Sequence, residues 1–104
     1  MAIPEIDVAE LARLRTEGEI VLVDVRQPDE HAEARVPGTV LIPLGEVAER
    51  FEEVPNEGTV YVICARGARS MKAAEFLAGQ GYDPVNVAGG TLAWIDAGHE
   101  TESG

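Results

Sequence analysis

Short runs of apolar residues alternate along the chain with segments in which apolar residues recur at helical spacing. The apolar runs are uninterrupted and rich in β-branched residues, which is typical of strands covered on both faces. Strands are expected at 20–23, 39–42, 59–63 and 85–87. Helices are expected from Asp7, an N-cap, to Gly18, and at 28–34, 44–51, 69–80 and 91–97. This alternation predicts an α/β fold in which helices flank both faces of a mainly parallel central sheet.

The length of 104 residues suits one domain with a modest core, which is expected to span 1–104. The segment 98–104 consists of polar and small residues, and it is expected to be disordered. The first residues lack the cationic start and apolar core of a signal peptide, and no apolar run approaches the length of a membrane span. A cytoplasmic location without membrane association is therefore expected.

The charge and the cysteine content narrow the function classes. A formal net charge of −11 argues against nucleic acid as a direct ligand, because such a ligand requires a basic face. The same charge is compatible with a protein partner that has a basic surface. The single cysteine excludes an intramolecular disulfide and any Cys-x-x-Cys redox pair.

That cysteine, Cys64, stands where the expected strand 59–63 ends and shortly before the expected helix 69–80 begins. At such a junction, the backbone N–H groups of a tight loop and the positive end of the helix dipole can converge on one atom. This environment lowers the pKa of a thiol and holds an anion against it. An isolated cysteine after a β-branched run is otherwise most often a small core residue.

The neighbours of Cys64 favour the functional interpretation. Arg66, Arg69 and Lys72 are three of the eight cationic residues, and no acidic residue occurs between Glu57 and Glu75. Gly67 supplies a position without Cβ, which a loop around an anion needs. Cys64 is therefore predicted to be a nucleophile in an anion-binding loop.

Two residues at the end of the expected strand 20–23 are predicted to support this site. Asp24 and Arg26 carry opposite charges directly after an apolar run, where a buried carboxylate needs a partner. A structural clasp beneath the site is favoured over a surface ion pair, and neither residue needs to touch the substrate.

Other candidate residues receive structural interpretations. His31 and His99 show no metal-ligand spacing with each other or with Cys64, so neither a metal nor another cofactor is expected. Gly67 is not followed by the Gly-Lys-Ser/Thr sequence of a nucleotide-binding P-loop. The pair Gly89-Gly90 permits a tight turn, after which Trp94 is expected to pack its helix onto the body.

Four motifs, in order and over nearly the whole chain, resemble those of the single-domain rhodanese-like sulfurtransferases. They are Asp24-Val25-Arg26-Gln27-Pro28-Asp29-Glu30; Val36-Pro37-Gly38-Thr39 with Ile42-Pro43; Cys64-Ala65-Arg66-Gly67-Ala68-Arg69-Ser70; and Gly89-Gly90-Thr91-Leu92-Ala93-Trp94. The resemblance implies the three-layer rhodanese-like fold. The sequence departs from the family pattern at His31, where an aromatic residue is common, and at Ala34-Arg35, where Gly-His is common. These departures concern the scaffold and the preference for donor or partner.

The resemblance also implies a mechanism in two half-reactions. The Cys64 thiolate attacks the outer sulfur of a donor such as thiosulfate, sulfite leaves, and Cys64 becomes a persulfide. Cyanide, a cellular thiol or a partner protein then accepts the sulfur. The residues implied in binding the substrate are Ala65, Arg66, Gly67, Ala68, Arg69 and Ser70.

Two alternatives from other classes stay open. A cysteine-based phosphatase or arsenate reductase would hold an oxyanion in a similar loop, but such enzymes follow a Cys-x5-Arg pattern, and four residues separate Cys64 from Arg69. The chain could also be a partner-binding module or a persulfide carrier that acts on another protein. A carrier and an enzyme both predict a persulfide on Cys64.

Overall fold

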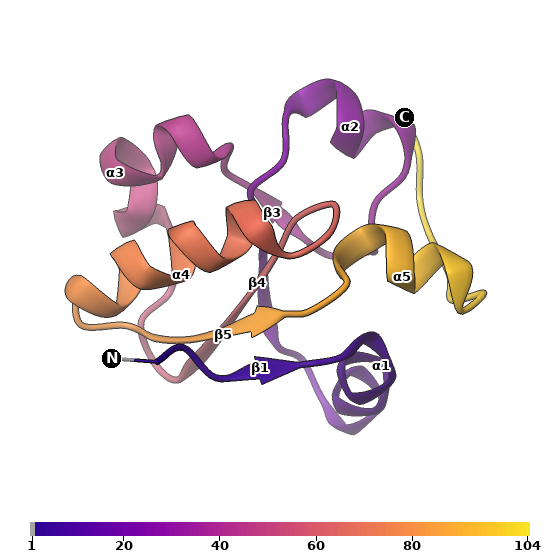
Figure 1. Ribbon diagram of the computed structural model, residues 1–104, viewed down its shortest axis with the longest axis horizontal. Coiled ribbons are helices and arrows are strands. Elements are labelled where there is room, and N and C mark those ends of the chain that lie inside the picture. Colours follow the sequence, from indigo (N-terminus) through magenta and orange to yellow (C-terminus); the bar gives the residue numbers. More distant parts are fainter. Residues whose placement is uncertain (1) are drawn as a thin grey trace.

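Five strands form one sheet, in the order β1-β5-β4-β2-β3, in a computed structural model that describes residues 2–104 (Figure 1). The strands are β1 (Glu5–Ile6), β2 (Val21–Asp24), β3 (Val40–Leu41), β4 (Thr59–Ile63) and β5 (Asp83–Val87). Each neighbouring pair is parallel. The predicted parallel sheet is thus confirmed, and the carboxyl ends of its strands share one edge.

Helices occupy all five segments in which the sequence predicts them. They are α1 (Val8–Glu17), α2 (Pro28–Glu33), α3 (Val47–Arg50), α4 (Ala68–Gly79) and α5 (Gly90–Asp96). Single 3-10 turns at Leu44–Glu46 and Phe51–Glu53 extend α3 at both ends. Asp7 caps α1 as predicted, since its carboxylate accepts a hydrogen bond of 2.9 Å from the backbone N–H of Glu10.

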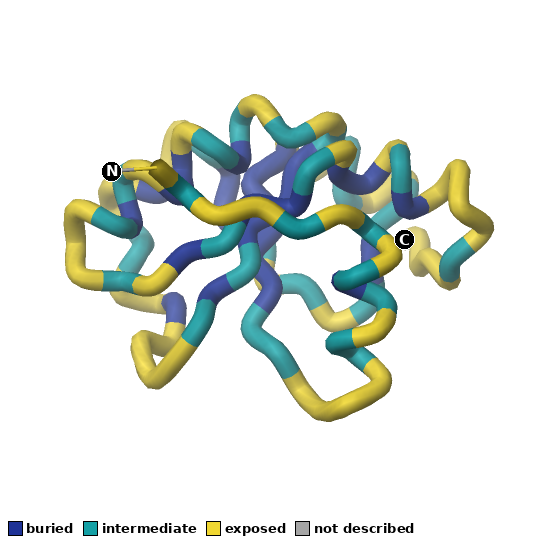
Figure 2. The backbone as a smooth tube through the Cα atoms, turned by 60° about the horizontal axis from the view of Figure 1, so that its bottom comes forward, coloured by how far each residue is buried: buried dark blue, intermediate teal, exposed yellow. Residues whose placement is uncertain are grey.

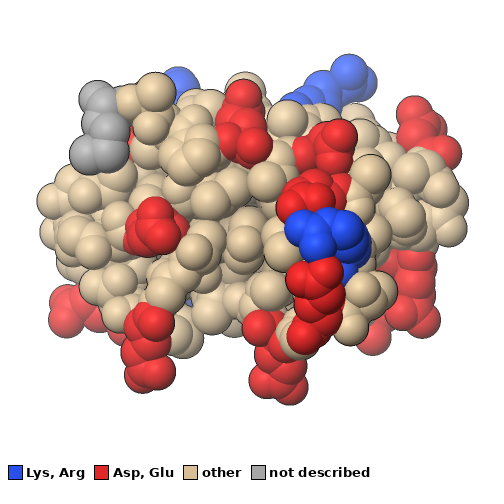
Figure 3. Space-filling view, turned by 90° about the horizontal axis from the view of Figure 1, so that it is seen from below, with Lys and Arg blue, Asp and Glu red and all other residues tan. Residues whose placement is uncertain are grey.

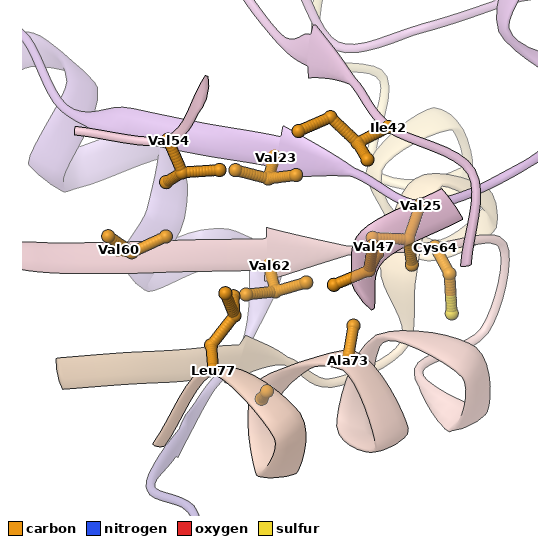
Figure 4. Packing of buried hydrophobic residues seen from close by; sticks show 11 residues of the cluster. Val23, Val25, Ile42, Val47, Val54, Val60, Val62, Cys64, Ala73 and Leu77 are labelled. Atoms are coloured by element: carbon orange, nitrogen blue, oxygen red, sulfur yellow. The ribbon is translucent and has the colours of Figure 1, made fainter. Parts of the chain in front are cut away.

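The apolar residues of the strands form two core layers, one on each face of the sheet. Val60 and Val62 of β4 belong to the cluster that includes buried residues of α3 and α4, whereas Ile63 belongs to the cluster on the other face, with buried residues of α1 and α5. Figure 4 shows the first layer, in which Cys64 lies next to Val25 and Val47 beyond the end of β4. The buried residues accordingly follow the central strands, with the exposed ones at the periphery (Figure 2). The three-layer prediction is confirmed.

The edge strand β1 is absent from the sequence-based expectation. Its exposed Glu5 and half-buried Ile6 give no apolar run, and the strand exists because it pairs with β5. The backbone N–H groups of Asn86 and Ala88 donate to the carbonyl groups of Pro4 and Ile6. Pairing with a distant segment, rather than local propensity, creates this strand.

The segment 98–104 lies against the body, which differs from the expectation of a disordered tail. Glu102 forms an antiparallel bridge with Arg35, and the Glu100 carbonyl accepts a hydrogen bond of 2.7 Å from the Trp94 indole. The ring of His99 stands 4.5 Å from that of Trp94. Composition misleads here because backbone groups and two rings, not an apolar pattern, make the contacts.

Most charges on the surface are acidic, as the composition requires. On the face shown in Figure 3, Asp and Glu side chains far outnumber Lys and Arg. Within residues 2–104, no helix is both long enough and apolar enough to cross a membrane.

Candidate active site

Cys64 directly follows β4, and a tight loop carries the chain from it into α4. Its sulfur accepts hydrogen bonds from the backbone N–H of Gly67, at 3.0 Å, and from the Ser70 hydroxyl, at 3.3 Å. Gly67 has a φ of +112°, a left-handed conformation that favours glycine and that turns the loop toward the helix. The predicted junction therefore exists, and the loop curls back around the cysteine sulfur.

The loop environment stabilises the thiolate of Cys64. Burial raises the pKa of this thiol, but hydrogen bonds from the Ser70 hydroxyl and from the backbone at Ser70, Gly67 and Arg66 outweigh that effect. The resulting pKa lies below the ordinary value of 9.0. Cys64 is 1% exposed, so its sulfur is shielded from bulk water. It accepts hydrogen bonds from the loop instead of from water.

The second glycine of Gly89-Gly90 does more than permit a tight turn, because it lets the backbone of α5 approach the loop after Cys64. Gly90 has a φ of +61°, and a Cβ there would lie 2.4 Å from the carbonyl oxygen of Cys64. The next two backbone N–H groups, of Thr91 and Leu92, donate to the carbonyl groups of Cys64 and Ala65. The start of α5 therefore clamps the backbone at Cys64 and Ala65.

Arg69, predicted to bind the substrate, is paired with a carboxylate. Its guanidinium donates to both carboxylate oxygens of Glu30, at 2.7 and 3.0 Å. The hydrogen bond from Arg69 is the main reason that the pKa of Glu30 falls to about 2, against the opposing effect of burial. Glu30 belongs to the first motif quoted above, but nothing in the sequence paired it with Arg69.

The other predicted loop residues differ in exposure. The side chain of Arg66 is exposed, as is Ala68 in the first turn of α4, whereas Ala65 and Gly67 are half-buried. Ser70 is buried, and its hydroxyl faces the sulfur. Arg66 is therefore the cation of this loop that solvent reaches most readily.

Asp24 and Arg26 form the predicted clasp. Both are buried, and the guanidinium of Arg26 donates to the two carboxylate oxygens of Asp24 at 2.8 to 3.1 Å. Arg26 also donates to the carbonyl group of Ala34 at 2.8 Å, which fastens the end of α2 to β2. The pair holds α2, and with it Glu30, beside the loop.

Asn86 is a further support that sequence reasoning did not identify. This buried residue of β5 donates through its amide nitrogen to the Gly67 carbonyl, at 3.2 Å, and to the Glu5 carboxylate, at 2.8 Å. A buried amide in an apolar strand was the available signal. It fixes Gly67, whose N–H faces the cysteine sulfur.

The histidines lie apart from this chemistry. His31 is half-buried, with its Nε2 atom 2.9 Å from the Thr39 hydroxyl, and burial lowers its pKa. In the part of the chain that the structure describes, no group of three His, Cys, Asp or Glu side chains could hold a metal ion. The arrangement can instead hold a thiolate, or a larger sulfur anion, against several N–H and O–H donors.

Comparison with known proteins identifies the group to which this arrangement belongs. Residues 7–97 match the profile of the rhodanese-like domain. The chain belongs to the rhodanese-like family. A crystal structure of a rhodanese-like domain protein from Staphylococcus aureus has a TM-score of 0.88 and 34% identity to it, and the match covers 98% of this chain and 99% of that one.

Named sulfurtransferases are among the relatives of this rhodanese-like chain. A sulfurtransferase of Allochromatium vinosum is 38% identical over 96 residues, which make up 90% of each chain. The thiosulfate sulfurtransferase PspE of Escherichia coli is 43% identical over 70 residues, or 65% of this chain and 67% of that protein. The chain is thus a rhodanese-like protein homologous to sulfurtransferases.

Proposed function

We propose that this protein is a sulfurtransferase that carries a sulfane sulfur as a persulfide on Cys64 and passes it to a thiophilic acceptor. The observation that carries the proposal is the convergence of the Gly67 N–H and the Ser70 hydroxyl on the Cys64 sulfur. These donors stabilise a thiolate before the reaction and a persulfide anion after it. The names of the two relatives support the same class of reaction.

In the first half-reaction, the Cys64 thiolate attacks the outer sulfur of thiosulfate. A sulfur–sulfur bond forms to Cys64, the sulfur–sulfur bond within thiosulfate breaks, and its electron pair leaves with sulfite. The three negative charges of the reactants stay three in the products, a persulfide anion and a sulfite dianion. The donor is assigned as thiosulfate because PspE is named for it.

In the second half-reaction, a nucleophilic acceptor attacks the outer sulfur of the persulfide. Cyanide would leave as thiocyanate, and a thiol would leave as a persulfide of its own. The electron pair of the broken bond returns to Cys64 as the thiolate, so no oxidant or reductant is consumed. Ping-pong kinetics are expected.

The two arginines of the loop have different roles in this proposal. Arg66, with its exposed side chain, attracts the dianionic donor. Arg69 acts with its charge partly compensated, since Glu30 occupies its guanidinium. The backbone N–H groups of the loop therefore bear a larger share of anion binding than the sequence suggested.

The decisive experiment is mass spectrometry of the intact protein after incubation with thiosulfate, before and after the addition of cyanide. The expected result is a gain of one sulfur atom that cyanide reverses and that Cys64→Ser lacks. No gain with thiosulfate, polysulfide or an organic persulfide would overturn the proposal. It would favour a phosphatase, an arsenate reductase or a partner-binding module.

The phosphatase alternative is disfavoured by the ion pair at Arg69. A phosphatase loop directs that guanidinium at the phosphate, and here two of the N–H groups of Arg69 donate to Glu30 instead.

A cytoplasmic location stays a prediction.

A further inference from the structure

A groove with a volume of about 210 Å³ lies beside the active loop, between α2 and α5. Residues that line it include Glu30, Glu33, Ala65, Thr91, Leu92 and Ile95. Ala65 is the residue after the nucleophile, so anything that occupies the groove contacts the active loop itself. Figure 1 shows α2 and α5 on either side of the loop that joins β4 to α4.

The α5 side of the groove is apolar and exposed. Among residues 2–104, the exposed large hydrophobic side chains are Val40, at 40%, and Leu92 and Ile95, at 43% each. Two of the three thus lie in this groove, one helical turn apart on α5. Because the two side chains are adjacent and lie beside the loop of Cys64, they favour a surface that a partner covers over isolated exposed apolar residues.

The floor of the groove includes an unpaired polar group. Thr91 is 1% exposed, and its hydroxyl has no hydrogen-bond partner in the described part of the chain. A buried hydroxyl without a partner is costly. A peptide N–H or C=O group that entered the groove would bring a partner toward it.

The α2 side of the groove carries negative charge. Glu30 is neutralised by Arg69, and Arg26, which also lines the groove, is neutralised by Asp24. Glu33 is exposed and adds an acidic group to the rim, in a chain of net charge −11. An occupant that is both apolar and cationic is complementary to this surface.

We propose that the groove between α2 and α5 docks a protein acceptor that presents an aliphatic and a cationic side chain beside its own thiol. This inference rests on the proposed function and names the partner of the same site. The aliphatic side chain packs on Leu92 and Ile95, and the cation faces Glu33. Docking there places the acceptor thiol next to the Cys64 persulfide.

The transfer of sulfur from Cys64 to the acceptor consumes no oxidant and no reductant. The acceptor thiol attacks the outer sulfur of the Cys64 persulfide anion and passes its proton to that sulfur, while a new sulfur–sulfur bond forms. The bond between this sulfur and the Cys64 sulfur breaks, and its electron pair stays on Cys64. The products are an acceptor persulfide, which keeps the proton, and the Cys64 thiolate.

Two synthetic peptides of equal length test the proposal. Each contains one cysteine, flanked in the first by leucine and lysine and in the second by serine and glutamate. The protein is loaded with thiosulfate, and loss of the extra sulfur is followed by mass spectrometry. Every peptide rate is divided by the rate with cyanide, so that changes in the chemistry at Cys64 cancel.

For the unaltered protein, the normalised rate with the leucine–lysine peptide should exceed that with the serine–glutamate peptide. The double variant Leu92→Ser/Ile95→Ser should lower the first rate about tenfold, as expected when the burial of an aliphatic side chain is lost. Glu33→Lys should lower it severalfold, and less so at high salt. The controls are Val40→Ser, which replaces the third exposed aliphatic residue by serine, and Glu52→Lys, which reverses the charge of an exposed glutamate; both positions lie outside the groove lining, and both variants should leave the normalised rate unchanged.

The outcomes separate the two proposals. Normal loading with equal rates for both peptides, or equal losses in the groove and control variants, would overturn the docking site alone. If Cys64 gains no sulfur from any donor, the proposed function fails, and the docking site falls with it.

Discussion

The carboxylate of Glu30 in α2 accepts two hydrogen bonds from the guanidinium of Arg69 in α4, a residue 39 positions further along the chain. The pair joins α2, which the Asp24–Arg26 clasp fastens, to the first turn of α4, the helix that follows Cys64. It also places a negative charge beside the cation expected to attract an anionic donor. The two effects, on the loop position and on the loop charge, can be measured separately.

The charge of Arg69 is tested by its removal. Arg69→Ala should raise the KM for thiosulfate about tenfold and change the KM for an uncharged organic persulfide less, because a charge-assisted contact is lost and Glu30 is left uncompensated. Adding Glu30→Gln should recover part of the loss with thiosulfate. Steady-state kinetics with both donors measure this. Equal losses on both donors, without recovery in the double variant, would assign Arg69 to the loop architecture alone.

The same ion pair predicts a dependence of stability on acid. The pKa of Glu30 is about 2 in the folded protein, below its ordinary 4.5, so its stabilising contribution is complete above about pH 4.5 and is lost as the pH falls toward 2. Glu30→Gln should therefore destabilise the protein by about 1 kcal/mol at pH 7, a modest value because solvent screens a pair about a third exposed. Urea unfolding at pH 7 and pH 3 measures the difference. A penalty that stays constant or grows at pH 3 would contradict the prediction.

Local sequence patterns predicted most of the helices and strands, but they did not predict contacts between residues far apart in the chain. The run at 59–63 and the helical spacing after Arg69 located Cys64 at a strand–helix junction, since both signals are local. The Asp24–Arg26 clasp was also within reach, because its partners are two positions apart. Strand β1 and the partner of Arg69 could not be found in this way. Each depends on a residue about 39 or more positions away that only the folded chain brings near.

The hydrogen bond from Ser70 predicts the pH at which Cys64 reacts. The thiolate is the reactive form, and its pKa lies below 9.0 because of donors that include the Ser70 hydroxyl. Ser70→Ala removes one donor, so the midpoint of the rate of alkylation by iodoacetamide should move to higher pH. Cys64 is the single cysteine, so each alkylation event reports on it. An unchanged midpoint would remove the Ser70 hydroxyl from thiolate stabilisation.

The close approach of α5 to the loop makes Gly90 the least replaceable glycine near the site. A Cβ at Gly90 would lie 2.4 Å from the Cys64 carbonyl oxygen and 2.6 Å from the Ala65 carbonyl group, and the residue has a φ of +61°. Gly90→Ala should therefore destabilise the protein by about 2–4 kcal/mol, through backbone strain and overpacking.

Gly79→Ala is the matched control for that change. It places the same methyl group at the end of α4, where nothing lies within 4 Å of the added Cβ. It should be neutral or stabilise the protein by about 0.5–1 kcal/mol, because alanine favours the helix. Thermal and urea unfolding of both variants measure the contrast. If Gly90→Ala were as stable as Gly79→Ala, the start of α5 would be able to yield, and it could not be the clamp that holds the Cys64 backbone in place.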